Sequence, residues 1–249
     1  MQAELSKIFR VHSYEIDFDR KLRPLSLLNY LQDTAGDHAA LLGFSIFDLI
    51  ERNLTWILSR YHLKITRYPA FGEKVSVITW PAGKNKLLFL REFEARDKEE
   101  GRCALASSGW ILFDLKKRRP VRPEKILRSF PVNNRRAITD DFRPLPKVNK
   151  ANLRSLFRVR ADDLDLNRHV NHARYMEWAL ETVPEELRGD YQPLEIESQF
   201  REAARYGDSI ICRTRIAAGE PSPTFIHQIL RKKDGKELTR LRTRWEQFP

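Results

Sequence analysis

The chain has 249 residues and a formal net charge of +11 at pH 7. Hydrophobic residues make up 41% and aromatic residues 10% of it, which excludes a disordered chain, because such chains lack the large apolar side chains that offset the entropy of ordering. No stretch approaches the roughly 20 apolar residues of a membrane span, and the first residues lack a basic segment followed by an apolar run. We therefore expect a soluble protein that is not exported and has no membrane span.

The positive charge raises the question of a nucleic-acid or acidic protein partner. The densest basic residues are Lys116, Lys117, Arg118, Arg119 and Arg122, followed by 231–233 and by the alternating Arg240, Arg242 and Arg244. No helix-turn-helix, zinc-finger or aromatic RNA-binding signature accompanies them, so we expect no nucleic-acid partner. Two interpretations stay open, namely solvated strand faces and a docking surface for an acidic protein.

Only two cysteines occur, Cys103 and Cys212, and each lies in a strand-like stretch. Two cysteines do not make the dense disulfide framework of small secreted domains. We expect two free, buried thiols in a reducing compartment.

The first part of the chain predicts one strand, one helix and four further strands. Residues 9–18 alternate like a strand. The helix is marked by apolar residues near helical spacing, namely Leu27, Leu31, Ala35 and Leu42. Ser26 is its predicted N-cap and Gly43 its predicted end. Further strands are expected within 54–68, 73–83, 86–97 and 103–115, with turns at 69–73, 81–85 and 97–101.

The pattern then changes and starts again. Residues 119–152 are rich in proline and show little periodicity, which predicts a linker. The 27 residues from Phe157 align without gaps onto the 27 residues from Phe9, and six positions are identical. A second helix is marked by Ala173, Met176, Leu180 and Val183 and is stopped by Pro184. Strands are expected within 194–202, 208–217, 224–233 and 238–248.

The sequence therefore indicates an internal duplication of one helix plus a mainly antiparallel sheet, an α+β arrangement. A helix that is apolar around much of its circumference is best buried if the sheet curls around it, which is the hotdog fold. We expect a tandem, or double, hotdog with an N-terminal copy over 1–118, a linker over 119–152 and a C-terminal copy over 153–249. Since single hotdog domains usually pair, the fused copies would make that pair within one chain.

The second copy carries polar residues at spacing two, Asp165, Asn167 and His169. This spacing predicts one side of an extended segment that runs into a helix, so that the three side chains could converge. An amide and an imidazole can hold a carbonyl oxygen or a water, which is the role of preorganised donors in acyl transfer. Asp165 and Asn167 also suit a turn, because both side chains bond nearby backbone.

The first copy lacks most of these groups. Opposite Asp165, Asn167, His169 and Glu202 it has Asp17, Asp19, Lys21 and Arg67. Glu202, from a neighbouring strand, can take a proton from water or attack a carbonyl itself, although a lone carboxylate is more often a surface residue. His169 and His172 are three residues apart, but no third or fourth metal ligand is evident nearby, so we expect neither a metal nor a cofactor.

The segment LDLNRHVNHARYMEW from Leu164 resembles the acyl-acyl carrier protein (acyl-ACP) thioesterases of plants and bacteria, tandem hotdog proteins that release free fatty acids from acyl carrier protein. The first copy is similar too, in PLSLLNYLQDTAGDHAALLG, PAFGEKVSVITWPAG and ASSGWILFDLKKRRPVRP. The resemblance implies a thioester hydrolase of fatty acid biosynthesis whose catalytic positions are Asp165, Asn167, His169 and Glu202. It also implies that the first copy shapes the acyl pocket with the apolar face from Leu27 to Leu42, and that the basic surface meets the acidic carrier.

Two departures from the plant members matter. Ala203 stands where they carry a cysteine after the glutamate, so a cysteine–histidine mechanism is not expected. The plant transit peptide is missing, which predicts a bacterial cytoplasmic enzyme. An acyl-CoA thioesterase, a non-catalytic acyl-thioester sensor and a dehydratase remain as alternatives. Acyl chain length and homodimer formation stay open.

Overall fold

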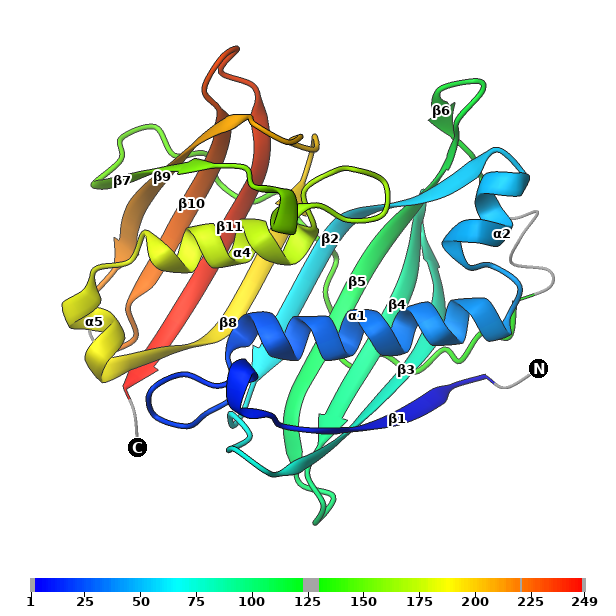
Figure 1. Ribbon diagram of the computed structural model, residues 1–249, viewed down its shortest axis with the longest axis horizontal. Helices are drawn as coiled ribbons and strands as arrows, with labels where there is room; N and C mark the ends of the chain where they lie inside the picture. The colour runs from blue at the N-terminus through cyan, green and yellow to red at the C-terminus, as the bar shows by residue number, and fades with distance from the viewer. Residues whose placement is uncertain (1–2, 123–129, 220, 248–249) are drawn as a thin grey trace. The chain divides into compact units, whose positions relative to one another are not determined.

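The computed structural model describes residues 3–122, 130–219 and 221–247, so 123–129 of the predicted linker lie outside the described residues. The chain divides into two compact units, Met1–Asp141 and Phe142–Pro249. In each unit a helix lies against one face of an antiparallel sheet (Figure 1). The prediction of a tandem α+β hotdog fold is confirmed.

In unit 1 the sheet order is β1-β3-β4-β5-β2, and β6 pairs with β5. Every pairing in this sheet is antiparallel. The elements are β1 (Leu5–Arg10), η1 (Ser13–Glu15), α1 (Pro24–Leu41), α2 (Ile46–Glu51), β2 (Leu54–Ile65), β3 (Lys74–Asn85), β4 (Leu88–Arg96), β5 (Arg102–Asp114) and β6 (Arg119–Pro120).

Unit 2 repeats this order as β7-β9-β10-β11-β8, again with antiparallel pairs. Its elements are β7 (Leu153–Arg158), η2 (Ala161–Asp163), α4 (His172–Glu181), α5 (Glu185–Asp190), β8 (Tyr191–Phe200), β9 (Ser209–Ala218), β10 (Thr224–Arg231) and β11 (Glu237–Gln247). The two sheets therefore share one topology, strand for strand.

The duplication extends to side-chain contacts. Phe9 on β1 stacks on Tyr30 of α1 with ring centroids 4.3 Å apart, and Phe157 on β7 stacks on Trp178 of α4 at 5.7 Å. Both pairs are related by the same offset of 148 residues that aligns the two sequences. The alignment by sequence is thus also an alignment in space.

Helix α1 begins three residues earlier than predicted, with Arg23 and not Ser26 at the N-cap position. Pro24 occupies its first position, where the fixed φ of proline suits a helix and its missing N–H is not needed. Ser26 is therefore not the N-cap, and its hydroxyl instead donates to the carbonyl of Glu15 at 3.0 Å. The predicted end at Gly43 is confirmed, because this residue has φ of +74° just after the helix.

Several local predictions were wrong. Strand β1 ends at Arg10, because the following residues form the turn η1, in which the Glu15 carboxylate accepts the His12 amide at 2.8 Å. The turn predicted at 81–85 lies later, since β3 continues to Asn85 through an irregularity after Pro81. Helices α2 and α5 were not predicted, because six residues are too few to show a helical period. Of the described residues, no helix is long and apolar enough to cross a bilayer.

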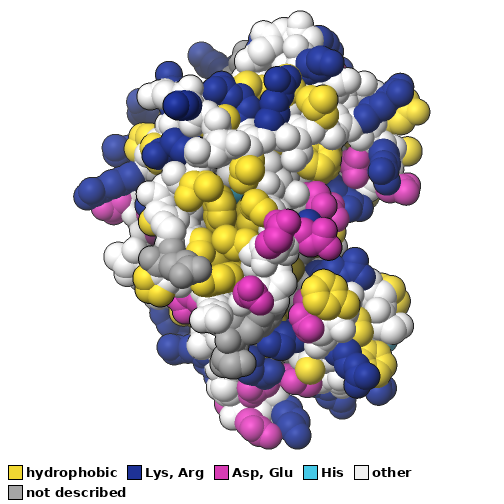
Figure 2. All heavy atoms as spheres, turned by 90° about the vertical axis from the view of Figure 1, so that its left-hand side faces the viewer, with side chains coloured by type: hydrophobic (Ala, Val, Ile, Leu, Met, Phe, Trp, Pro, Cys, Tyr) yellow, Lys and Arg dark blue, Asp and Glu magenta, His cyan; other side chains and the backbone are white. Residues whose placement is uncertain are grey.

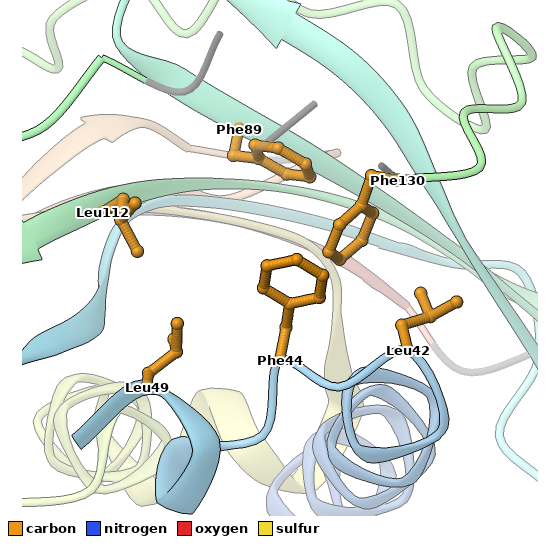
Figure 3. Close-up of a cluster of buried hydrophobic side chains, with 6 residues drawn as sticks. All are labelled: Leu42, Phe44, Leu49, Phe89, Leu112 and Phe130. Atoms are coloured by element: carbon orange, nitrogen blue, oxygen red, sulfur yellow. The ribbon is translucent and has the colours of Figure 1, made fainter. Parts of the chain in front are cut away.

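The interior of unit 1 contains a buried cluster at the end of α1 (Figure 3). Six side chains point toward one another there, namely Leu42, Phe44, Leu49, Phe89, Leu112 and Phe130. They come from the end of α1, the α1–α2 connection, α2, β4, β5 and the segment after residue 129. Through this cluster, β4 and β5 of the sheet pack against α2 and the end of α1.

One charge lies inside unit 1. Arg91 is buried on β4 at two residues from both Phe89 and Phe93, and its Nη1 lies 3.2 Å from His38 Nδ1 and 3.3 Å from Thr79 Oγ1. Burial lowers the pKa of Arg91 to about 10. Within the described part of the chain it has no carboxylate partner. The guanidinium is therefore a charged group between the buried side chains of Phe89 and Phe93 on β4.

The opposite face of the same sheet is covered by residues 133–140. The buried carboxylate of Glu92 accepts Arg136 Nε at 2.9 Å and the Ser107 hydroxyl at 2.7 Å. Trp80 Nε1 donates to the carbonyl of Arg135 at 2.7 Å. The later part of the predicted linker thus packs on the sheet of unit 1.

Unit 2 has a smaller apolar cluster of Val183, Phe225 and Trp245. Figure 2 looks at the end of the molecule that carries α5 and the C-terminus, and it shows hydrophobic side chains in a hollow of that face. Deeper in the unit, His227 lies between Thr214 at 2.8 Å and Thr243 at 3.0 Å. Burial lowers the pKa of His227 to about 3, so it is a neutral core residue.

One glycine inside α1 and one just after its end allow a stability test. Gly36 is exposed inside the helix with nothing within 4 Å of an added Cβ, whereas Gly43 needs its positive φ. We expect Gly36→Ala to raise the free energy of unfolding by about 0.5–1 kcal/mol and Gly43→Ala to lower it by about 1–2 kcal/mol. Urea unfolding followed by circular dichroism measures both, and a shift of the same sign for the two variants would contradict this account of the helix end.

Candidate active site

The predicted site residues Asp165, Asn167 and His169 lie in a tight turn. Leu164 and Val170 close it as an antiparallel bridge, and the Asp165 amide donates to the His169 carbonyl at 2.8 Å. The Asp165 carboxylate accepts the amides of Asn167 at 2.8 Å and His169 at 3.1 Å. The predicted extended segment is therefore wrong, because the aspartate side chain captures two backbone amides and folds the chain back.

Unit 1 contains the same turn without the same chemistry. The Asp17 carboxylate accepts the amides of Asp19 and Lys21, each at 3.0 Å. Arg20 has φ of +60° there, as Arg168 has φ of +58° in unit 2. An aspartate that forms the same bonds in both copies is a turn former, and the difference between the copies lies in the residues that the turn presents.

A backbone bond sets this turn beside the segment that carries Glu202. The Val170 amide donates to the Ala204 carbonyl at 3.0 Å, and the Ala204 amide donates to Tyr175 Oη of α4 at 2.7 Å. Asn171 caps α4 by accepting the Ala173 amide at 3.0 Å. The turn, the start of α4 and the end of β8 therefore meet at one place in unit 2.

Glu202 follows β8 and is held by two cations. Its Oε1 lies 2.7 Å from Arg231 Nη2 and 3.5 Å from Lys236 Nζ. The bond from Arg231 is the main reason that the pKa of Glu202 is lowered from its usual value. At neutral pH the group is therefore an ionised carboxylate, with 42% of its side chain exposed.

The four predicted residues are brought together only in part. Among the residues that the structure describes, no hydrogen bond joins their side chains to one another. The His169 imidazole is half-buried, the Asn167 amide is exposed, and neither side chain has a polar partner in the described ranges. Convergence of these groups on a substrate remains a prediction, while their neighbourhood in the backbone is observed.

Sequence reasoning did not find Arg231. It was grouped with the surface lysines that follow it, although its side chain is only 9% exposed. The pairing of Arg231 with Glu202 depends on the register of β10, which the sequence does not display. An aligned comparison of the two hairpins would have given a signal, because Asp97 occupies the corresponding place in unit 1.

The two cysteines are free and buried, as predicted. Burial raises the pKa of the Cys212 thiol on β9 to about 11 and also raises that of Cys103. A reactive thiolate needs the opposite shift. Neither thiol is therefore poised as a nucleophile.

His172, the neighbour of His169 at spacing three, is the first residue of α4. Its ring packs edge-on against Phe200, with centroids 6.1 Å apart. Desolvation lowers the pKa of His172 to about 4, so the imidazole is neutral at pH 7. Its surroundings are those of a packed side chain.

The basic groups differ in how far they are neutralised. In the alternating series on β11, Arg242 bonds Glu197 of β8, and Arg244 lies 3.1 Å from Glu195. The exposed residues after β5 are Lys116, Lys117, Arg118, Arg119 and Arg122. Within the described ranges this second group has no ion pair, so its charge stays available at the surface.

Comparison with known proteins identifies the family. Residues 3–129 match the acyl-ACP thioesterase N-terminal domain, and residues 147–247 match the acyl-ACP thioesterase C-terminal domain. The chain therefore belongs to the acyl-ACP thioesterase family.

Plant relatives resemble nearly the whole chain. A chloroplastic acyl-[acyl-carrier-protein] hydrolase of Cuphea viscosissima is 30% identical over 95% of this chain. A chloroplastic palmitoyl-acyl carrier protein thioesterase of Arabidopsis thaliana is 31% identical over 95% of it. The chain spans 61% and 62% of the length of these two relatives.

Solved structures agree in fold. The 12:0-ACP thioesterase from Umbellularia californica matches 99% of this chain and 95% of its own, at 25% identity and a TM-score of 0.89. An acyl-ACP thioesterase from Bacteroides thetaiotaomicron matches 98% of both chains, at 26% identity and a TM-score of 0.87.

The two aspartate turns provide a matched test. We expect Asp17→Ala and Asp165→Ala each to lower the free energy of unfolding by about 1–2 kcal/mol, because each leaves two amides without their acceptor. Only Asp165→Ala should also slow the thioester hydrolysis that we propose for this chain, by ~10-fold or more, since it releases the turn that presents Asn167 and His169. Thermal unfolding and thiol-release rates measure the two effects. Equal losses of activity in the two variants would contradict the assignment of the site to unit 2.

Proposed function

We propose that the chain hydrolyses the thioester of fatty acyl-ACP, giving a free fatty acid and the holo carrier with water as the acceptor. One observation carries this proposal. An ionised, half-exposed carboxylate, Glu202, lies at the end of β8 beside the turn of Asn167 and His169, and unit 1 has Arg67 and Lys21 in the corresponding places. The names of the relatives as acyl-ACP hydrolases support the same reaction.

The proposed roles follow from the chemistry of each group. Asn167 and His169 would donate hydrogen bonds to the thioester carbonyl or to water. Glu202 would accept the proton of the attacking water or attack the carbonyl itself. Asp165 would act by holding the turn that carries the two donors. The site would work without a metal or cofactor, because a thioester is already an activated acyl group.

We assign the acyl chain to the N-terminal copy. The proposed division is an N-terminal hotdog with the acyl pocket at 1–118, a linker at 119–152 and a catalytic hotdog at 153–249. The buried Leu27 and Leu31 of α1 line the apolar interior of this copy, against which an acyl chain would pack. Unit 2 supplies the polar chemistry. The two tasks would thus be divided between the copies.

Acyl carrier protein is the proposed partner, and its acidic surface would meet basic residues of this chain. The exposed group from Lys116 to Arg122 supports this partner, since it has no ion pair in the described ranges. We propose a bacterial cytoplasmic setting, which the two free thiols and the match to a Bacteroides protein support.

The test is release of free thiol from one acyl group carried on acyl carrier protein and on coenzyme A, with chain lengths from C4 to C18. We expect faster release from the carrier protein, and a KM for it that rises with salt, because screening weakens charge attraction. Glu202→Gln and His169→Ala should each lower kcat/KM by about 10²–10⁴-fold. Unfolding temperatures near that of the wild type would exclude misfolding.

Other outcomes point to other functions. Faster release from coenzyme A, without salt dependence, would favour an acyl-CoA thioesterase. Binding of acyl thioesters with no turnover, unchanged in both variants, would favour a non-catalytic sensor. Dehydration of a hydroxyacyl thioester without free thiol would indicate a dehydratase. Each of these results would contradict the proposal.

A further inference from the structure

Glu202 and Arg67 occupy the same backbone position in the two units. The Arg67 amide donates to the carbonyl of Cys103 at 3.2 Å, and the Glu202 amide donates to the carbonyl of Leu238 at 3.2 Å. In unit 1 this bond links the segment just after β2 to β5. In unit 2 it links the segment just after β8 to β11. The two residues are therefore structural equivalents of opposite charge.

Their partners are equivalents too. The β4–β5 hairpin is closed by the Asp97 amide, which donates to the Gly101 carbonyl at 2.9 Å. The β10–β11 hairpin is closed by the Arg231 amide, which donates to the Lys236 carbonyl at 2.9 Å. Asp97 and Arg231 thus occupy corresponding positions, at the starts of the two hairpin loops.

In each unit an ion pair joins these two positions, and the positions of the cation and the anion are exchanged between the units. In unit 1 the cation comes first, and Arg67 Nη2 lies 2.9 Å from Asp97 Oδ2. In unit 2 the anion comes first, and Glu202 Oε1 lies 2.7 Å from Arg231 Nη2. The same two backbone positions are thus joined whichever of them carries the anion. Stability alone therefore does not require a carboxylate at position 202.

We propose that Arg231 is a positioning residue, which holds Glu202 by one carboxylate oxygen and leaves the other oxygen directed to the substrate. This inference rests on the proposed hydrolytic function of Glu202. Both contacts of the carboxylate, from Arg231 and from Lys236, go to Oε1. Within the described residues no partner bonds Oε2.

The guanidinium is itself fixed. Asp234 accepts Arg231 Nε at 3.1 Å and Nη2 at 3.0 Å, and Asp208 lies 3.9 Å from Nη1. Arg231 is 9% exposed while Glu202 is 42% exposed, so an anchored cation orients a more accessible anion. A bidentate bond of this kind loses less side-chain entropy than a lysine contact would.

The groups around Glu202 set its titration. Arg231 and Lys236 lower its pKa, and desolvation opposes them. Asp208 and Asp234 are the acidic groups packed against Arg231. Removing the guanidinium leaves Lys236 as the cation that the described residues still place beside Glu202, so the pKa of Glu202 should rise.

The experiment compares Arg231→Gln, Arg231→Lys and wild type by the pH dependence of kcat/KM and by NMR titration of the Glu202 carboxyl, assigned with Glu202→Gln. We expect Arg231→Gln to move both the acidic limb of the profile and the Glu202 pKa upward by about 1 unit or more. Its kcat should fall ~10-fold or more while KM changes little, because orientation is lost. Arg231→Lys should keep the acidic limb of the profile and lose part of kcat. If the glutamine variant does not fold, the loss of kcat in Arg231→Lys is the test.

The matched control is Asp97→Asn, which opens the equivalent ion pair of unit 1. It should change stability about as much as Arg231→Gln does and leave the pH profile and kcat unchanged. An unchanged Glu202 pKa and an unchanged kcat in Arg231→Gln would overturn the inference even if wild type hydrolyses acyl-ACP. Absence of hydrolysis in wild type would instead remove the proposed function, and the NMR titration would still decide whether Arg231 governs Glu202.

Discussion

The backbone bond between the entry turn of the helix and the end of a strand is the constraint on which both units depend. In unit 2 it joins Val170 to Ala204, and in unit 1 it joins Leu22 to Pro69 at 2.7 Å. Because the helix covers the apolar face of the sheet, this junction at the edge is a place where the turn, the helix start and the segment after the strand present polar side chains together. An aspartate turn fixes the junction in both copies, and the side chains that it presents are left to vary.

The two copies use this scaffold for different purposes. At the junction unit 1 carries Lys21 and an arginine bonded to two carboxylates, Glu73 and Asp97. Unit 2 carries His169 and a carboxylate bonded to an arginine. Both arrangements pair the charges after the end of a strand, and in unit 2 the carboxylate of Glu202 remains 42% exposed. A duplicated fold can therefore carry the same ion pair in either sense, and the sense in unit 2 leaves the carboxylate that we propose as the reactive group.

The sequence predicted the fold well because its signals were periodic and repeated. The apolar spacing of Leu27, Leu31 and Ala35 located α1, and the match of Phe157 to Phe9 located the second copy. It left the segment at Asp165 open between an extended strand and a turn, since alternation of residues alone does not show that a side chain binds the backbone. Nor could it give Arg231, whose role arises from the register of two strands, whereas the partial neutralisation of the basic groups depends on cross-strand pairs such as Arg244 and Glu195.

The most direct test of the account is a charge exchange in unit 2, with Glu202→Arg and Arg231→Asp made together. This double variant copies the sense of the ion pair of unit 1 but removes the cation that Asp234 binds, so it should fold with a free energy of unfolding about 1–3 kcal/mol below that of wild type. Release of free thiol from acyl-ACP should nevertheless fall to the background rate. Retained hydrolysis in the folded double variant would show that the carboxylate of Glu202 is not the reactive group, and it would contradict the central claim.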